Sequence, residues 1–165
     1  MKSRPKPRGA DLSYSKKLAI SGITIALFIV IMFLSQGFAF GQYQVRLATS
    51  LYSLAAIYPF LVIPLGIANF LSNTIMGGLG PFDMIGGLAA GIITSFLCHI
   101  ARKINTAWIA APIIAVPALL VPIWLQYLIG VPYWPLALSL GAGQVIPGIL
   151  GVMIVKYLEK PLLKI

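Results

Sequence analysis

Residues 47–75, LATSLYSLAAIYPFLVIPLGIANFLSNTI, are the stretch on which the fold depends, because they can form either one helix or two. As a single α-helix, these 29 residues would be roughly 44 Å long at 1.5 Å per residue. The hydrocarbon core of a bilayer is only roughly 30 Å thick. Pro59 and Pro64 interrupt the run, and proline kinks or breaks a helix. The run therefore forms one long, kinked helix or two short helices that turn near Pro59.

The composition places the chain in a membrane. Of its 165 residues, 59% are hydrophobic and 9% are charged, and the mean hydropathy is +0.97. These values lie far outside those of soluble domains. Four further apolar runs have the length of a single span: residues 18–34, 84–100, 107–129 and 136–155. The sequence therefore predicts an all-α integral membrane protein.

The distribution of lysine and arginine decides between five and six spans. With six spans and a cytoplasmic N-terminus, every one of the twelve Lys and Arg residues except Arg46 is cytoplasmic. With five spans they divide six against six, which violates the positive-inside rule. We therefore predict six transmembrane helices with both termini cytoplasmic. We expect residues 1–15 to form a basic cytoplasmic tail and residues 16–165 to form a single six-helix transmembrane domain.

Polar side chains concentrate near the outer side of this predicted topology. They are Gln36, Gln42, Gln44, Arg46, Asn73, Asp83, Gln126, Tyr133, Trp134 and Gln144, with Asn69 one turn deeper. Gly66, Asn69 and Asn73 are spaced by three and four residues, so they share one helix face. Buried amides are costly in hydrocarbon unless they face protein or water. The pattern predicts an outward-facing pocket for a polar small molecule.

Structural roles for the same residues stay open. Asp83 can cap the fourth helix. Arg46 can pair with Asp83 or reach lipid headgroups instead of touching a ligand. The three amides, Asn69, Asn73 and Gln144, can serve as hydrogen bonds between helices. Tyr133 and Trp134 can be ordinary interface anchors.

Several function classes are excluded. The net charge of +9 is confined to the chain ends and one short loop, which argues against nucleic-acid binding. The chain contains no G-x-x-x-x-G-K-[ST] for ATP phosphates. Cys98 is the only cysteine and His99 is the only histidine in the sequence, which is too few for a Cys/His metal site. None of the three acids lies near mid-membrane, where ion coupling needs them. We expect no enzymatic activity and no cofactor, but a binding subunit that takes its energy from partner proteins.

Small residues and prolines add two further expectations. Ala19, Gly22 and Ala26 form a smooth stripe on the first helix, which either docks another helix or packs inside the bundle. Prolines recur every five residues in the fifth helix, at positions 112, 117 and 122, and should bend it.

The stretch YQVRLATSLYSLAAIYPFLVIPLGIANFLSNTIMGGLGPFDMIGG resembles the QueT family. These proteins are substrate-binding (S) components of energy-coupling factor (ECF) transporters and are associated with queuosine precursors. The resemblance covers roughly residues 15–158. Its most specific portions are QVRLATSL, IPLGIANFLS and GPFDMIGGLAAG. The chain departs from the family at one point, because members often carry R-x-x-E and here Thr49 follows Arg46 at that spacing.

The resemblance implies a multi-pass protein of a prokaryotic plasma membrane that captures a vitamin-like ligand from outside. Its partners would be a membrane coupling protein, which docks on the stripe of Ala19, Gly22 and Ala26, and two cytoplasmic ATPases. A deazaguanine base would place its donor edge on Asp83, with polar contacts from Arg46 and Asn69 and stacking on Tyr43 or Trp134. The expected substrate-binding set is completed by Gln44, Asn73 and Gln144. Alternatives are an S component for cobalamin or another vitamin, and a membrane scaffold without transport function.

Overall fold

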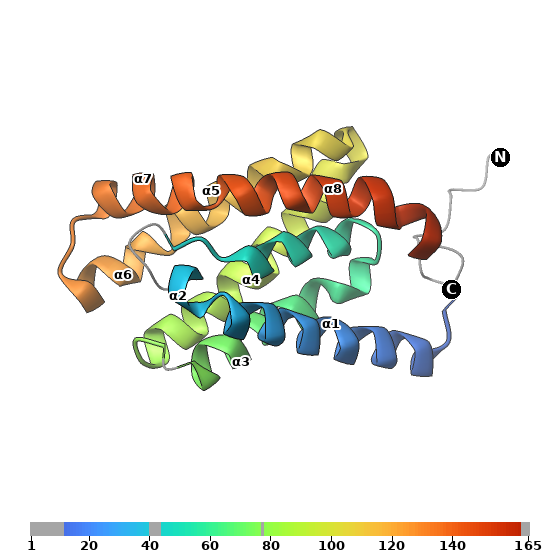
Figure 1. Cartoon of the computed structure of the whole chain (residues 1–165), viewed down its shortest axis with the longest axis horizontal. Helices are drawn as coiled ribbons and strands as arrows, with labels where there is room; N and C mark the ends of the chain where they lie inside the picture. The colour runs from blue at the N-terminus through green and yellow to red at the C-terminus, as the bar shows by residue number, and fades with distance from the viewer. Residues whose placement is uncertain (1–11, 40–43, 77, 163–165) are drawn as a thin grey trace.

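The computed structural model describes residues 12–39, 44–76 and 78–162, which form helices and no strand (Figure 1). The α-helices are α1 (Tyr14–Leu34), α2 (Gln36–Ala39), α3 (Val62–Ile75), α4 (Pro81–Ile104), α5 (Ala110–Leu120), α6 (Pro122–Ile129), α7 (Tyr133–Gly143) and α8 (Val145–Leu162). Three 3₁₀ helices join them: η1 (Leu47–Ala56), η2 (Pro59–Leu61) and η3 (Thr106–Ile109). Each apolar run predicted from the sequence is therefore helical.

The run at residues 47–75 forms two helical segments. The first, η1, ends at Ala56, and η2 begins at Pro59 and continues into α3 in the opposite direction (Figure 1). Tyr58 has an extended backbone, with φ −122° and ψ 95°, because the ring of the following proline disfavours the helical conformation. The predicted turn near Pro59 is confirmed.

The 3₁₀ geometry of η1 was not predicted. Ten residues are a long run for this helix type. Its rise of about 2.0 Å per residue gives a length of about 20 Å, against about 15 Å for an α-helix. Residues three apart are aligned in a 3₁₀ helix, so Arg46, Thr49 and Tyr52 follow one another along one face. Small side chains suit the crowded position of η1, in which residues 48–56 are all buried.

The segments run back and forth between two ends of the molecule. Tyr58, after η1, donates a hydrogen bond to the carbonyl of Leu162 at the end of α8. Asp83 lies at the start of α4, and Arg102 lies near its end. We call the end with Arg46 and Asp83 the cavity end. The lysine end holds the other described cations: Lys16, Lys17, Arg102, Lys103, Lys156 and Lys160.

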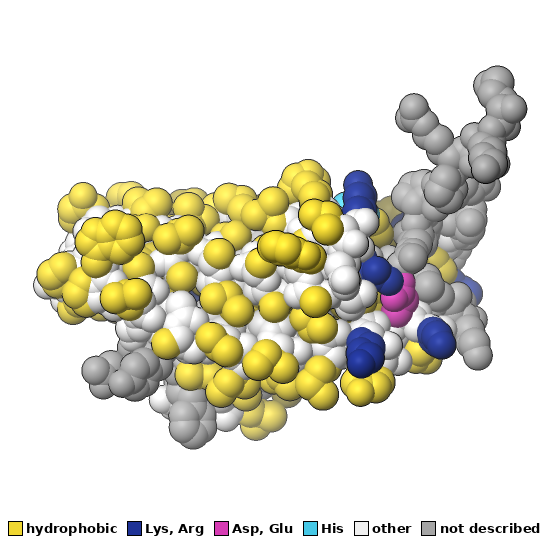
Figure 2. Space-filling view, turned by 90° about the horizontal axis from the view of Figure 1, so that it is seen from above, with side chains coloured by type: hydrophobic (Ala, Val, Ile, Leu, Met, Phe, Trp, Pro, Cys, Tyr) yellow, Lys and Arg dark blue, Asp and Glu magenta, His cyan; other side chains and the backbone are white. Residues whose placement is uncertain are grey.

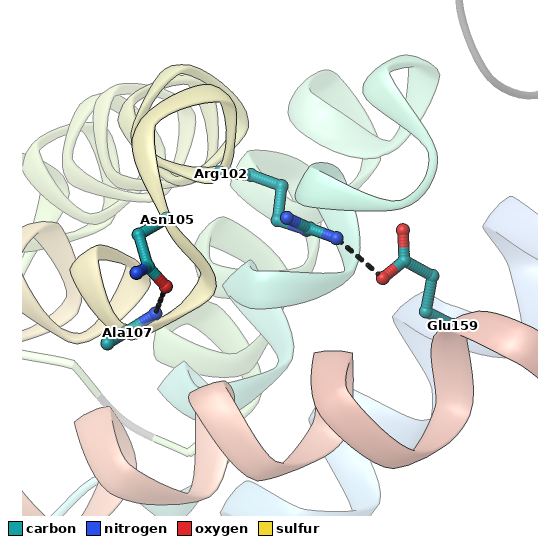
Figure 3. A network of polar contacts seen from close by, with 4 residues as sticks. All are labelled: Arg102, Asn105, Ala107 and Glu159. Atoms are coloured by element: carbon teal, nitrogen blue, oxygen red, sulfur yellow. Dashed lines mark hydrogen bonds and ion pairs between the residues drawn. The ribbon is translucent and has the colours of Figure 1, made fainter.

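Figure 2 shows hydrophobic side chains over most of one face, with the charged side chains gathered at the lysine end. There Arg102 Nη2 of α4 lies 2.8 Å from Glu159 Oε2 of α8 (Figure 3). In the next turn of chain, Asn105 Oδ1 accepts a hydrogen bond from the backbone N–H of Ala107 and caps η3.

By length and hydropathy, four of the described helical segments can cross a membrane: Tyr14–Leu34, Pro81–Ile104, Thr106–Ile129 and Tyr133–Leu162. The segments Leu47–Ala56 and Pro59–Ile75 are apolar but shorter. Helices α3 and α4 pack very closely, because a Cβ on Gly91 would lie 2.9 Å from the Cα of Gly66. This contact brings the polar face of α3 against α4.

Prolines interrupt two of the long segments. The run at residues 107–129 is divided at Val121 between α5 and α6, because Pro122 has no N–H to donate to the preceding turn. Val121 itself keeps helical dihedral angles, φ −60° and ψ −40°, so the predicted bend of this helix stays a prediction. The last run, residues 136–155, is divided at Gln144 between α7 and α8, a break that was not predicted. Here Pro147 provides no N–H for the carbonyl of Gly143.

Candidate functional site

Arg46 reaches α3 and, through it, the start of α4. Its Nη1 donates a hydrogen bond to Asn73 Oδ1 at 3.3 Å. Asn73 Nδ2 in turn donates to the backbone carbonyl of Asp83 at 3.2 Å. The Asn73 side chain is completely buried, so both ends of its amide are used inside the protein. Asn73 therefore positions Arg46 relative to Asp83.

Asp83 lies in the first turn of α4 but does not cap it. The N-cap is Gly80, whose φ of 100° is a conformation that favours glycine. The carboxylate of Asp83 is favoured by the positive end of the helix dipole. Its Oδ1 accepts a hydrogen bond from Trp124 Nε1 of α6 at 3.1 Å. Trp124 packs on Gly86, where a Cβ would lie 2.6 Å from the indole ring.

A cavity of about 770 Å³ opens beside Arg46 and Asp83, and we call it the main cavity. Its lining residues are Gln36, Gly37, Gln44, Arg46, Met76, Gly78, Leu79, Asp83, Leu125, Ile129, Val131, Pro135, Leu136 and Ser139. Most of this wall is apolar, with a few polar groups and one charge of each sign. Such a wall is typical of small-molecule sites, whose volumes are about 300–1,000 Å³.

A second, much smaller space of about 20 Å³ lies behind this wall, and we call it the small chamber. It is lined by Gln44, Arg46, Thr49, Tyr52, Asn69, Ala90, Pro117, Val121, Leu140 and Gln144. Gln44 and Arg46 border both spaces. The two spaces are thus separated by residues that precede η1.

Gln144 lies at the break between α7 and α8 and is completely buried. Its Nε2 donates to the backbone carbonyl of Gln44 at 3.3 Å. The hydroxyl of Thr49 lies 2.7 Å from Gln144 Oε1 and 2.6 Å from the carbonyl of Arg46. A hydroxyl carries one hydrogen, so Thr49 donates to only one of these oxygens at a time. These contacts fix the chain on either side of Arg46.

The amides of α3 lie against a glycine of α4. Asn69 Nδ2 donates to the carbonyl of Gly87 at 2.8 Å. A Cβ on Gly87 would lie 2.7 Å from Asn73 Nδ2 and 3.4 Å from Asn69 Nδ2. Glycine is therefore needed for both amides to approach α4. Gly66, Asn69 and Asn73 are all buried, as expected for residues that share one face.

The predicted site residues thus occupy several different places. Arg46, Asp83 and Gln44 line the main cavity, whereas Asn69 and Gln144 line the small chamber. Asn73 lies behind the charged residues. The Trp134 side chain is 69% exposed and packs edge-on against Tyr133, outside the lining of the main cavity. Tyr43 lies outside the described residues.

Three residues of the site were missed by sequence reasoning: Trp124, Tyr52 and the side chain of Thr49 as a partner of Gln144. Tyr52 and Thr49 follow Arg46 at intervals of three, a signal that becomes meaningful only for a 3₁₀ helix. Trp124 lies two residues before Gln126 in an apolar run, and only the tertiary structure brings it to Asp83.

The stripe of Ala19, Gly22 and Ala26 is exposed on α1. A Cβ on Gly22 would meet nothing within 4 Å. The sequence left open whether this stripe packs inside the bundle or docks another helix. Among the described residues, no helix packs against it. A neighbouring helix could therefore approach this face closely.

Comparisons with known proteins identify the family. The model of the QueT transporter family matches residues 18–160, which is nearly the whole chain. Neither a curated protein nor a solved structure matches the chain. The chain belongs to the QueT transporter family and, with four apolar helical segments of spanning length among the described residues, is a multi-pass membrane protein.

Proposed function

We propose that this member of the QueT transporter family is the substrate-binding subunit of an ECF-type importer, and that it binds a deazaguanine queuosine precursor in the main cavity. The observation that carries the proposal is the position of Arg46 and Asp83, of opposite charge, in a largely apolar wall. Membership of a transporter family also favours transport over a scaffold role.

The proposed topology has six crossings of a prokaryotic plasma membrane, with the lysine end cytoplasmic. The six proposed membrane-crossing segments are α1, η1, η2–α3, α4, η3–α5–α6 and α7–α8. They form one domain, residues 16–165, after a basic cytoplasmic tail. Cations at one end support this orientation through the positive-inside rule, and the long rise of η1 helps a short segment to cross. The main cavity then opens to the outside.

The chemistry of the cavity suits a planar base. A guanine-like edge donates hydrogen bonds to a carboxylate, and its carbonyl accepts from a guanidinium. Trp124 binds Asp83 Oδ1. Oδ2 faces Gly78 of the cavity lining, where a Cβ would lie 3.0 Å away. The volume of about 770 Å³ is that of a drug-sized ligand site, which favours a base or nucleoside over the much larger cobalamin.

We further propose that the exposed stripe on α1 docks on the membrane coupling protein of the importer, which carries two cytoplasmic ATPases. Gly22→Leu should reduce co-purification with the coupling protein, because the added side chain holds the helices apart. Substrate binding should be unchanged, since Gly22 contacts neither the main cavity nor the small chamber. Unchanged co-purification would contradict docking through this stripe.

Equilibrium binding to the purified protein in detergent tests the proposed substrate. The panel contains prequeuosine bases, queuine, guanine and cobalamin. We expect one deazaguanine to bind and Arg46→Ala to weaken its binding by about 10- to 100-fold, the effect of a hydrogen bond to a charged group. Arg102→Ala, at the lysine end, is the matched control and should not change affinity. Binding of cobalamin alone would identify a different substrate, and no binding would contradict the proposed substrate class.

A further inference from the structure

Two polar atoms of residues that line the small chamber lack a hydrogen-bond partner among the described residues: the hydroxyl oxygen of Tyr52 and Oδ1 of Asn69. Their side chains are only 1% and 4% exposed, and both residues line the chamber. Leaving such atoms unsatisfied in a buried position is unfavourable. A molecule in the chamber would resolve this.

The orientation of Asn69 defines what the occupant must offer. Because Nδ2 donates to the carbonyl of Gly87, the amide cannot be flipped without losing that bond. Oδ1 is therefore a fixed acceptor and requires a donor. The Tyr52 hydroxyl can donate or accept. The nearby amide of Gln144 is already engaged through both Nε2 and Oε1.

Volume and charge restrict the occupant further. A volume of about 20 Å³ is sufficient for one water, which needs roughly 10–15 Å³ by this measure. Arg46 in the chamber wall disfavours a cation, and the fixed oxygen of Asn69 disfavours an anion. A neutral group that both donates and accepts fits both conditions.

We propose that the small chamber holds one ordered water, which donates to Asn69 Oδ1 and accepts a hydrogen bond from the Tyr52 hydroxyl. The water lies directly behind Gln44 and Arg46, the two residues that border both spaces. It links η1 to α3 at the level where the proposed substrate site begins. The water site does not depend on the identity of the substrate.

The thermal unfolding of the substrate-free protein, with Tyr52→Phe, tests this directly. If a water is bound, the substitution removes one of its partners, and Tm should fall by about 2–4 °C. If the chamber is empty, the substitution removes an unsatisfied hydroxyl, and Tm should rise or stay unchanged. A higher Tm or an unchanged Tm would overturn the proposal.

Ser53→Ala is the matched control. The Ser53 hydroxyl is also fully buried and has no hydrogen-bond partner among the described residues, but Ser53 does not line the chamber. Its removal should not lower Tm.

A double variant shows whether the fall in Tm caused by Tyr52→Phe depends on the bound water. In an Asn69→Leu background, which abolishes the acceptor, Tyr52→Phe should cause no further fall in Tm. Equal falls in both backgrounds would contradict a shared water.

Substrate binding separates a resident water from a substituent of the substrate. If the substrate supplied the hydroxyl or amino group, Tyr52→Phe would weaken its binding while leaving the substrate-free Tm unchanged, and this would overturn the water site. Because the Tm measurement uses no substrate, the water site and the proposed substrate can fail independently.

Discussion

The two ends of the molecule each hold a cation and an acid, but in opposite surroundings. At the lysine end, Arg102 and Glu159 pair directly at 2.8 Å, and their side chains are 26% and 17% exposed. At the cavity end, Asp83 is 4% exposed. Its backbone carbonyl and Arg46 are joined through the amide of Asn73.

This difference separates a structural use of charge from a functional one. Water can solvate both members of a partly exposed pair, so the pair contributes little to folding. A buried charge needs fixed partners to offset its desolvation. At the cavity end, those partners also hold the charged groups at the wall of a cavity. Substitutions at the cavity end should therefore cost more than substitutions at the lysine end.

The largest effect is expected from Asn73→Leu. It removes the acceptor used by Arg46 and leaves the carbonyl of Asp83 without its donor. We expect the free energy of unfolding in detergent to fall by about 2–4 kcal/mol. Asn105→Ala at the lysine end, which removes only a helix cap, should cost about 1 kcal/mol. A smaller loss for Asn73→Leu than for Asn105→Ala would contradict the idea that the charges at the cavity end depend on fixed, buried partners.

Gly87→Val should be the next most damaging change. The new Cβ would lie 2.7 Å from Asn73 Nδ2, and overpacking of this kind costs about 1–3 kcal/mol. Gly22→Val is the control, because a Cβ there meets nothing within 4 Å. Denaturation midpoints of the two variants check this, and equal midpoints would argue against tight packing of the two amides on α4.

Trp124→Phe should affect substrate binding more than stability. It removes the indole N–H that orients Asp83 Oδ1, and we expect substrate affinity to fall by about 10-fold, corresponding to about 1.4 kcal/mol. Trp134→Phe, at an exposed position, should leave affinity unchanged. An equal loss in both variants would contradict a specific role of the Trp124–Asp83 hydrogen bond in substrate binding.

The smallest effect is expected at the lysine end. Glu159→Gln should lower the free energy of unfolding by about 0.2–1 kcal/mol. High salt should reduce the difference from the wild type, because salt screens partly exposed charges. Thermal unfolding at two salt concentrations measures this. A salt-independent loss of several kcal/mol would mean that this pair behaves as a buried one.

Much of the fold could be predicted because its causes are local. Apolar length predicts the helices, Pro59 marks the turn, and spacing places Asn69 and Asn73 on one face of α3. The break at Gln144 follows from Pro147, which has the same local cause but was not recognised. The 3₁₀ form of η1 could not be read from the sequence, because burial on all sides by other helices supports it.

The site was less predictable because it depends on contacts between distant segments. Arg46 and Asp83 were identified by their rarity in an apolar chain, and they line one cavity. The sequence offered no means to know that Trp124 reaches Asp83, 41 residues away. The sequence also could not show that Asn69 and Gln144 line a different space from Asp83. The small chamber exists only after η1, α3 and α7 have packed together.

The most direct test of the account compares the two acids in one experiment. The affinity of the ligand that binds from the panel is measured for the wild type, Asp83→Asn and Glu159→Gln under identical conditions. We predict that Asp83→Asn weakens binding by about 10- to 100-fold, whereas Glu159→Gln leaves it unchanged. Equal affinities for all three proteins would contradict the assignment of the substrate site to the cavity end.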